Sequence, residues 1–218
     1  MITKNAPILI TGATGFVGSY VVRRLLAAGY NNLHATRRSG SRMDLLAGAE
    51  DQLQWHEAAL DDYFSLEDAT QGMHTVIHCA ALVSFAPRDA QRLLDINRRG
   101  TKYMIDAAVH QQVSFFIQLS SVAALGRDPN GAPVTEKTKW EEGPLISNYS
   151  RSKFLAETEI WRGQAEGLRV ASLYPTIVLG AGRWREGSVA MFDYASRGPK
   201  YYPGGSTGFV DVREVAEA

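Results

Sequence analysis

Two side chains in one short stretch of the sequence have the types and the spacing of an acid/base pair. Positions 149–153 read YSRSK, which places Tyr149 and Lys153 four residues apart. On a helix this spacing puts both side chains on one face. A free tyrosine has a pKa of about 10, and a neighbouring ammonium lowers it toward the range useful for proton transfer at neutral pH. The alternative is two polar side chains on the solvent face of a helix.

The elements around this pair alternate between apolar strands and amphipathic helices. Strands are expected at 8–11, 32–36, 53–58, 75–81, 114–121 and 168–174, and helices after the first strand and at 65–72, 88–110 and 149–166. Apolar strands that alternate with helices require a parallel sheet covered on both faces. The expected fold class is therefore α/β, a doubly wound parallel sheet (Rossmann) over residues 1–174. Residues 175–218 are expected to begin a substrate-binding cap and to return a strand to the core.

Composition excludes several classes of partner. The 218 residues include 23 basic and 23 acidic side chains, so no net charge attracts nucleic acid or an anionic membrane. The single cysteine, Cys79, cannot form an intramolecular disulfide. The N-terminal apolar run is too short for a signal peptide, and no run is long enough to span a bilayer. We expect a cytoplasmic protein that acts on a small molecule.

A glycine-rich turn follows the first expected strand. The stretch TGATGFVGS lets the chain turn sharply into a helix and lets the backbone approach a pyrophosphate closely. The helix N-terminus then offers unpaired N–H groups and a positive dipole end. The alternative is a tight turn without a ligand. The residues expected to contact a dinucleotide here are Gly12, Thr14, Gly15, Phe16, Val17 and Gly18.

The end of the second strand indicates which dinucleotide is bound. NAD-specific folds place an acidic residue there for the ribose diol, whereas this chain reads ATRRSGSR. Arg37 and Arg38 are suited to a 2′-phosphate through charge-assisted hydrogen bonds, so NADP(H) is favoured over NAD(H). A solvated basic turn is the alternative.

Several motifs together resemble one enzyme family. TGATGFVG, VIHCAA, INRRGT, LSSVAALG and YSRSK occur in the order found in extended short-chain dehydrogenases/reductases, of the NAD(P)-dependent epimerase/dehydratase type. The resemblance covers nearly the whole chain and is greatest to the branch of dihydroflavonol reductases and 3β-hydroxysteroid dehydrogenases. It implies dimerisation through the helices near 90–110 and 150–165, which makes a homodimer a candidate assembly.

The resemblance also implies catalytic roles. Tyr149 matches the general acid/base, Lys153 its partner, and Ser121 the catalytic serine, with Ser120 as the alternative. Asn97 matches the asparagine that links the lysine to solvent and holds the long helix in place. The residues implied in cofactor contact, beyond the glycine turn and the two arginines, are Asp61, Ala80, Ala81, Lys153, Pro175 and Val178.

Departures from the family pattern bear on the adenine contact and on the substrate. Ala59 stands where relatives usually carry an aspartate that contacts adenine, and Asp61 or Asp62 is the expected substitute. Tyr174 stands where sugar-nucleotide epimerases often carry a cation. The Asp-Glu pair of the dehydratases is replaced by Val122 and Ala123 after the catalytic hydroxyl. These departures favour a plain carbonyl/alcohol redox reaction.

The sequence therefore predicts an NADP(H)-dependent oxidoreductase acting on a small, hydrophobic substrate. Reduction of a carbonyl needs a hydride, which the cofactor supplies, and a proton, which Tyr149 supplies. The alternatives are a nucleotide-sugar epimerase, and a non-catalytic protein that binds NADP(H) for regulation. Either the chain is naturally short or it is an incomplete version of a longer protein.

Substrate contacts are expected from the loops 82–85 and 124–127, from the segment 176–209, and from the catalytic residues Ser121 and Tyr149. The apolar side chains of these segments contact a hydrophobic substrate or, alternatively, pack a cap against the sheet. The histidines lack metal-ligand spacing, so no metal site is expected. His78 and Cys79 are expected to be core residues rather than a nucleophilic pair. The apolar candidates are Val83, Phe85, Trp184, Met191, Phe192, Tyr201 and Tyr202.

Overall fold

Six parallel strands form the central sheet of the protein. The computed structural model describes residues 2–126, 133–143, 146–201 and 207–218. The strands lie in the order β3-β2-β1-β4-β5-β6, and every neighbouring pair is parallel. The order reverses between β1 and β4, as in a doubly wound sheet, which confirms the expected fold class. The strands are β1 (Ile8–Thr11), β2 (Leu33–Arg37), β3 (Gln54–Glu57), β4 (Thr75–His78), β5 (Phe115–Leu119) and β6 (Val170–Leu173).

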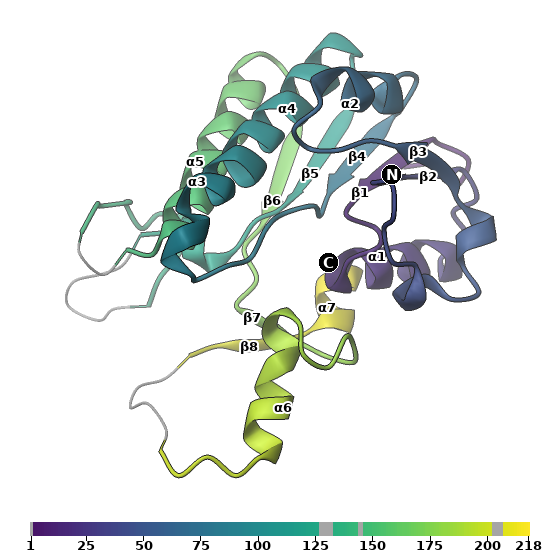
Figure 1. The fold of residues 1–218 in the computed structure, drawn as a ribbon. Helices are drawn as coiled ribbons and strands as arrows, with labels where there is room; N and C mark the ends of the chain where they lie inside the picture. The colour runs from purple at the N-terminus through teal and green to yellow at the C-terminus, as the bar shows by residue number, and fades with distance from the viewer. Residues whose placement is uncertain (1, 127–132, 144–145, 202–206) are drawn as a thin grey trace.

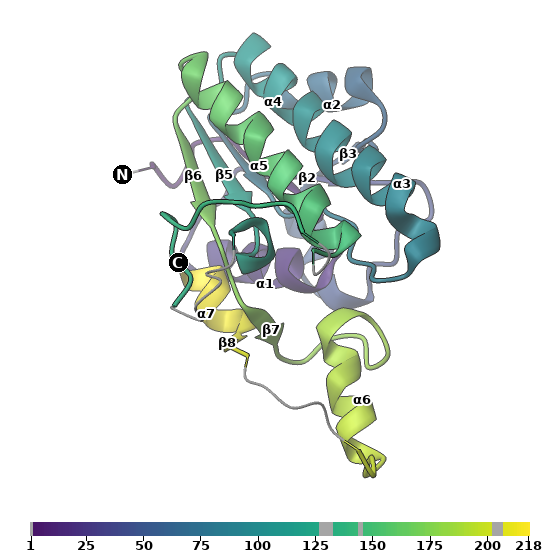
Figure 2. The ribbon, with the colours of Figure 1, turned by 90° about the vertical axis from the view of Figure 1, so that its left-hand side faces the viewer.

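Helices cover both faces of this sheet (Figures 1 and 2). One face carries α1 (Phe16–Ala27) and α7 (Val212–Glu217), which pack against each other. The other face carries α2 (Tyr63–Thr70), α3 (Ala90–Leu93), α4 (Gly100–His110) and α5 (Asn148–Ala165). Strand β1 is buried throughout, as a strand covered on both faces must be.

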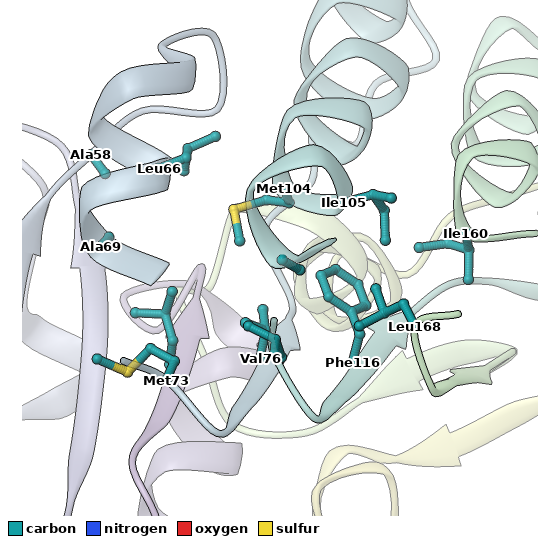
Figure 3. Packing of buried hydrophobic residues seen from close by; sticks show 13 residues of the cluster. Ala58, Leu66, Ala69, Met73, Val76, Met104, Ile105, Phe116, Ile160 and Leu168 are labelled. Atoms are coloured by element: carbon teal, nitrogen blue, oxygen red, sulfur yellow. The ribbon is translucent and has the colours of Figure 1, made fainter. Parts of the chain in front are cut away.

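The larger hydrophobic cluster lies between the sheet and α2, α4 and α5 (Figure 3). Phe116 of β5 is fully buried there against Ile105 of α4 and Ile160 of α5. Side chains alternate along a strand, so positions 116 and 118 of β5 face the same helices. This alternation places polar side chains further along β5 beneath α5.

The helix expected at 88–110 is divided into several parts. A 3₁₀ turn at Pro87–Asp89 leads into α3, a π-helical segment follows at Leu94–Arg99, and α4 completes the stretch. The wider π turn contains Asn97, which is 2% exposed. Such turns frequently occur at functional sites because they redirect one side chain out of the helical register.

The last part of the chain forms a small second sheet outside the main one. Strands β7 (Ile177–Leu179) and β8 (Phe209–Asp211) pair with each other in parallel, and α6 (Ala190–Ser196) lies between them in sequence. The strand expected to return to the core is therefore paired with β7 rather than with β6. It is α7, directly after β8, that packs onto α1 of the main domain (Figure 1).

Candidate active site

The glycine turn after β1 is packed against the end of β4. Gly12 has φ +69°, a left-handed conformation that glycine adopts without strain. A Cβ on Gly12 would lie 2.7 Å from the backbone of Ala80, and a Cβ on Gly18 would lie 2.2 Å from the Gly12 carbonyl oxygen. These two glycines are therefore needed for the turn and for the approach of helix to strand.

The N-terminus of α1 has the features of an anion site. Gly15 occupies the N-cap without a side-chain cap, and the first turn contains no acidic residue. A Cβ on Gly15 would meet only the Gly12 oxygen within 4 Å, so its other side faces open space. The unpaired N–H groups of this turn suit a pyrophosphate, and Thr14, Phe16 and Val17 remain predicted contacts here.

The end of β2 presents two exposed arginines, Arg37 and Arg38, which the sequence analysis assigned to a 2′-phosphate. The Arg37 guanidinium lies 5.3 Å from the centre of the Trp55 ring, and Arg38 follows it in the turn. The nearest acidic residue along the chain, Asp44, accepts hydrogen bonds from Arg183, with a closest distance of 2.6 Å. That hydrogen bond is the main reason why the Asp44 pKa falls to about 2, and the nearby guanidinium charges lower it further.

The loop after β3 contains the proposed adenine contact. Asp61 is exposed at the carboxyl end of the sheet, where the structure leaves its side chain accessible. The neighbouring Asp62 instead caps α2, because its carboxylate accepts from the Ser65 N–H at 3.4 Å. Of the two aspartates, Asp61 therefore remains the better candidate for a ligand contact.

Lys153 is buried beneath the sheet edge. The N-cap Ser147 begins α5 by accepting from the Ser150 N–H at 3.0 Å, which places Tyr149 in the first turn and Lys153 in the second. Lys153 is 2% exposed, and its Nζ donates to the Leu119 carbonyl oxygen at the end of β5 at 3.0 Å. Burial lowers the pKa of Lys153 to about 8. The solvent-face alternative for this lysine is thus wrong.

Tyr149 lies beside Ser121 and Phe85. Burial raises the pKa of Tyr149, and the Ser121 hydroxyl, close enough to act as its hydrogen-bond partner, opposes that effect. The rings of Phe85 and Tyr149 have their centres 5.5 Å apart. The expected lowering of the Tyr149 pKa by Lys153 is not found, because burial has the larger effect on the phenol and the lysine donates to the Leu119 carbonyl.

The two serines at the end of β5 have different environments. Ser121 caps the short 3₁₀ turn Val122–Ala124, with its Oγ accepting from the Ala123 N–H at 3.1 Å. Ser120 is 5% exposed, and its Oγ has no partner among the described residues. Ser121 is the serine placed next to Tyr149, which favours it over Ser120 as the residue that holds a substrate oxygen.

Asn97 connects three segments of the site. Its Oδ1 accepts from the Leu82 N–H at 2.7 Å, and its Nδ2 donates to the Leu82 carbonyl at 2.9 Å and to Ser152 Oγ at 2.9 Å. Ser152 Oγ in turn donates to the Tyr149 carbonyl at 2.8 Å. The amide of Asn97 therefore joins the loop after β4 to the first turn of α5, which carries Tyr149.

His78 is a buried core residue, as the sequence predicted, whereas Cys79 is half-buried and packs against the edge of the core. His78 is 1% exposed, its Nδ1 pairs with Thr11 Oγ1 at 2.7 Å, and burial lowers its pKa to about 3. Burial raises the pKa of Cys79 to about 12, so its thiol is not an available nucleophile. Ala80 and Ala81 follow them at the strand end, where Ala80 meets the glycine turn.

The predicted nicotinamide segment follows β6. The Pro175 carbonyl accepts from the Val122 N–H at 3.1 Å, and Val178 lies in β7. The site therefore has Ser121 and Pro175 on adjoining segments at the carboxyl ends of β5 and β6. Ligands in open parallel sheets bind at this edge.

The predicted substrate-contacting side chains are largely exposed. Phe85 lies near Tyr149, and Val83 is exposed in the same loop. Trp184 and Phe192 instead stack on each other in the lobe around α6, with ring centres 6.3 Å apart. Tyr202 and Arg127 lie outside the described residues. Met191 and Tyr201 are exposed in the same lobe.

Two residues of the site were not anticipated from the sequence. Arg183, after β7, donates to the Thr14 carbonyl at 3.2 Å and to Asp44, which ties the start of the cap to the glycine turn. Glu157 is 2% exposed on α5. Glu157 could have been predicted from its spacing, because it is a charged residue four positions beyond Lys153. No pattern near Arg183 in the sequence indicates its role.

A glycine turn at a helix N-terminus and a Ser–Tyr–Lys group at the same sheet edge are the features of dinucleotide-dependent enzymes on a doubly wound sheet. The family model described as "NAD dependent epimerase/dehydratase family" matches residues 8–218, and the chain belongs to this family. This confirms the family that the sequence motifs predicted.

Individual relatives agree with the reductase branch. The chain is 28% identical to cinnamoyl-CoA reductase 2 of Arabidopsis thaliana over 99% of this chain and 68% of the relative. It is 30% identical to a putative dihydroflavonol 4-reductase of Synechocystis over 95% of this chain and 60% of the relative. The crystal structure of gox2253 superposes with a TM-score of 0.88, at 31% identity over 98% of this chain and 64% of that one. The chain thus spans about two thirds of the length of these proteins.

No helix in the described parts of the chain is long and apolar enough to cross a membrane.

Proposed function

We propose that this protein is an NADP(H)-dependent oxidoreductase that interconverts a carbonyl and a secondary alcohol on a small hydrophobic substrate. The observation that carries the proposal is the convergence of Ser121, Tyr149 and Lys153 at the carboxyl edge of β5. Lys153 also faces the end of β4, which abuts the glycine turn, so the acid/base group and the dinucleotide turn share one edge.

The chemistry of these side chains supports this reaction. The bound cofactor supplies the hydride for the carbonyl carbon. The Ser121 hydroxyl holds the carbonyl oxygen, and Tyr149 donates the proton that this oxygen takes up. In this proposal the Lys153 ammonium favours the tyrosinate that is left behind, although burial has the larger effect on the Tyr149 pKa. Asn97 keeps the first turn of α5 in place through Ser152.

The preference for NADP(H) rests on the charges at the end of β2. Arg37 and Arg38 are exposed there, whereas the carboxylate of Asp44 is engaged by Arg183. A phosphate on the ribose would therefore meet the two guanidinium groups, with Glu57, the register partner of Arg37, as an exposed carboxylate beside them. The exposed ring of Phe85 beside Tyr149, and the exposed Val83 in the same loop, support a hydrophobic substrate.

The first test is a panel of aldehydes, ketones and secondary alcohols followed by NADPH absorbance. Tyr149→Phe is expected to lower kcat/KM at least roughly 100-fold, because it removes the proton donor. Tyr63→Phe, which removes a hydroxyl bonded to Glu67 on α2, is the matched control. Undiminished turnover in Tyr149→Phe would contradict the assignment. Interconversion of nucleotide sugars without net change in NADPH would favour an epimerase, and cofactor binding without any turnover would favour a regulatory protein.

The second test is calorimetric titration with NADP⁺ and NAD⁺. We expect the protein to bind NADP⁺ roughly tenfold tighter or more, and we expect Arg37→Asp combined with Arg38→Ala to remove that preference. Arg169→Asp changes an exposed arginine at the start of β6 and should leave it unchanged. A preference of the unaltered protein for NAD⁺ would overturn the 2′-phosphate argument.

A further inference from the structure

A carboxylate is buried one helical turn beyond Lys153. Glu157 is 2% exposed and lies four residues after Lys153 on α5, a spacing at which helical side chains are neighbours. Its Oε1 accepts from Ser172 Oγ at 2.6 Å and from Tyr174 OH at 2.7 Å, so two hydroxyls of β6 and its exit hold it in place. Burial and the proximity of Glu157 raise the pKa of Tyr174, which keeps this hydroxyl protonated as a donor.

In the described part of the chain, buried polar atoms without a hydrogen-bond partner occur on α5 and along β5 and its exit. Glu157 Oε2, Gln118 Oε1 and Ser120 Oγ are buried without a hydrogen-bond partner among the described residues. Positions 118 and 120 face α5, because they alternate with the strand's outward positions, and Gln118 is the register partner of Ser172. Burial of a polar group without a hydrogen bond lowers the stability of the folded state. Several such groups in one protein therefore call for a physical explanation.

The other titratable groups that face Lys153 are uncharged at neutral pH. From β4, burial lowers the pKa of His78 to about 3 and raises that of Cys79 to about 12. From α5, burial raises the pKa of Tyr149. Glu157, one helical turn from Lys153 on α5, is therefore the carboxylate that acts on it, through space rather than in an ion pair, and it opposes the lowering of the Lys153 pKa by burial. A buried ammonium without such a partner would lose its proton at lower pH.

We propose that Glu157 is a positioning residue for Lys153, whose buried carboxylate keeps the neighbouring ammonium charged while Ser172 and Tyr174 hold the carboxylate in place. Its importance for turnover rests on the proposed function, because Lys153 acts there on Tyr149. The charge coupling between the two side chains is a separate property, and it is measurable without any substrate.

The decisive experiment is a double-mutant cycle of Glu157→Gln and Lys153→Met, read from urea unfolding at pH 6.5 and pH 9.5, on either side of the Lys153 pKa of about 8. We expect the two substitutions to be coupled roughly tenfold in the unfolding equilibrium constant at the lower pH and not measurably at the higher pH. Coupling that is absent at both values, or equal at both, would overturn the proposal.

Two further variants serve as a control and as a substitute. Glu159→Gln is the matched control, because Glu159 is also a buried carboxylate of α5 but pairs with Arg162 at 3.0 Å; its coupling to Lys153→Met should be absent at both pH values. If Glu157→Gln does not fold, Glu157→Asp takes its place. It keeps the charge one methylene further back, and the cycle should then show a smaller coupling that again disappears at pH 9.5.

The pH dependence of kcat/KM supplies the catalytic readout. The rate of the unaltered protein is expected to fall above about pH 8, and in Glu157→Gln this limb should move roughly one pH unit lower, with the rate recovering in acid. Glu159→Gln should leave the pH at which the rate falls unchanged. A variant that only damaged the structure would instead lower kcat/KM at every pH. If no carbonyl is turned over, the proposed function fails and the unfolding cycle alone decides the role of Glu157.

Discussion

The region between α5 and β5 and the lobe around α6 both carry side chains that the sequence assigned to the active site, but they are held in different ways. Lys153 and Asn97 are buried, and each has a defined hydrogen-bond partner in another element. Trp184 and Phe192 are exposed, and their rings stack on each other. The groups proposed for chemistry are thus fixed by the main domain, whereas the groups proposed for substrate contact lie on a surface that the main core does not organise.

The comparison predicts that removal of an aromatic ring lowers the free energy of unfolding by different amounts in the two regions. Phe116→Ala in the core under α5 should lower the free energy of unfolding by about 3 to 5 kcal/mol, because a fully buried ring leaves a cavity. Trp184→Ala, whose residue is 55% exposed, should change it by about 0.5 kcal/mol. Urea unfolding followed by circular dichroism measures both. Equal costs would mean that the lobe around α6 is as firmly packed as the core.

The buried charge of Lys153 predicts a pH dependence of stability. The pKa of Lys153 is lowered from 10.5 to about 8 in the folded protein, so between these values the unfolded chain binds more protons. The free energy of unfolding should therefore rise with pH over pH 8 to 10, by about 2 to 3 kcal/mol. Lys153→Met should lack this rise, measured as the difference between the two unfolding curves. A parallel pH dependence in both proteins would place Lys153 in solvent.

The smallest predicted effect concerns the join between the two regions. Arg183 ties the segment after β7 to Thr14 of the glycine turn and to Asp44. Arg183→Gln should speed amide hydrogen exchange in the segment 180–189 by about tenfold, because hydrogen bonds to a charged group are lost there. Exchange in α5 should not change. Arg185→Gln, at an exposed arginine of the same loop, is the control, and equal acceleration by both variants would remove Arg183 from this role.

Much of the fold was predictable from local patterns. The glycine turn between an apolar strand and an amphipathic helix predicted where β1 ends and α1 begins. The alternation of strands and helices predicted the parallel sheet. The wider turn at Asn97 was not predictable, because helical periodicity does not show a π-helical segment. The pairing of β8 with β7 was also missed, since strand pattern alone does not specify the partner.

The candidate site likewise has features that the sequence predicts and features that it does not. The types and spacing of Tyr149 and Lys153, and the arginines after β2, are properties of the sequence itself. Whether that lysine is a surface side chain or a buried cation depends on where α5 lies against β5, and only the tertiary structure decides this.

The same holds for Glu157. In the sequence it is a charged residue four positions beyond Lys153, and in the structure it is a buried carboxylate held by Ser172 and Tyr174. The sequence by itself determined which chemical groups are present, their order and the class of fold that carries them. The tertiary structure decided which of those groups lose water and which face one another. Desolvation and contact across β4, β5 and α5 depend on packing between residues far apart in the chain, and these effects shift the proton affinity of the site.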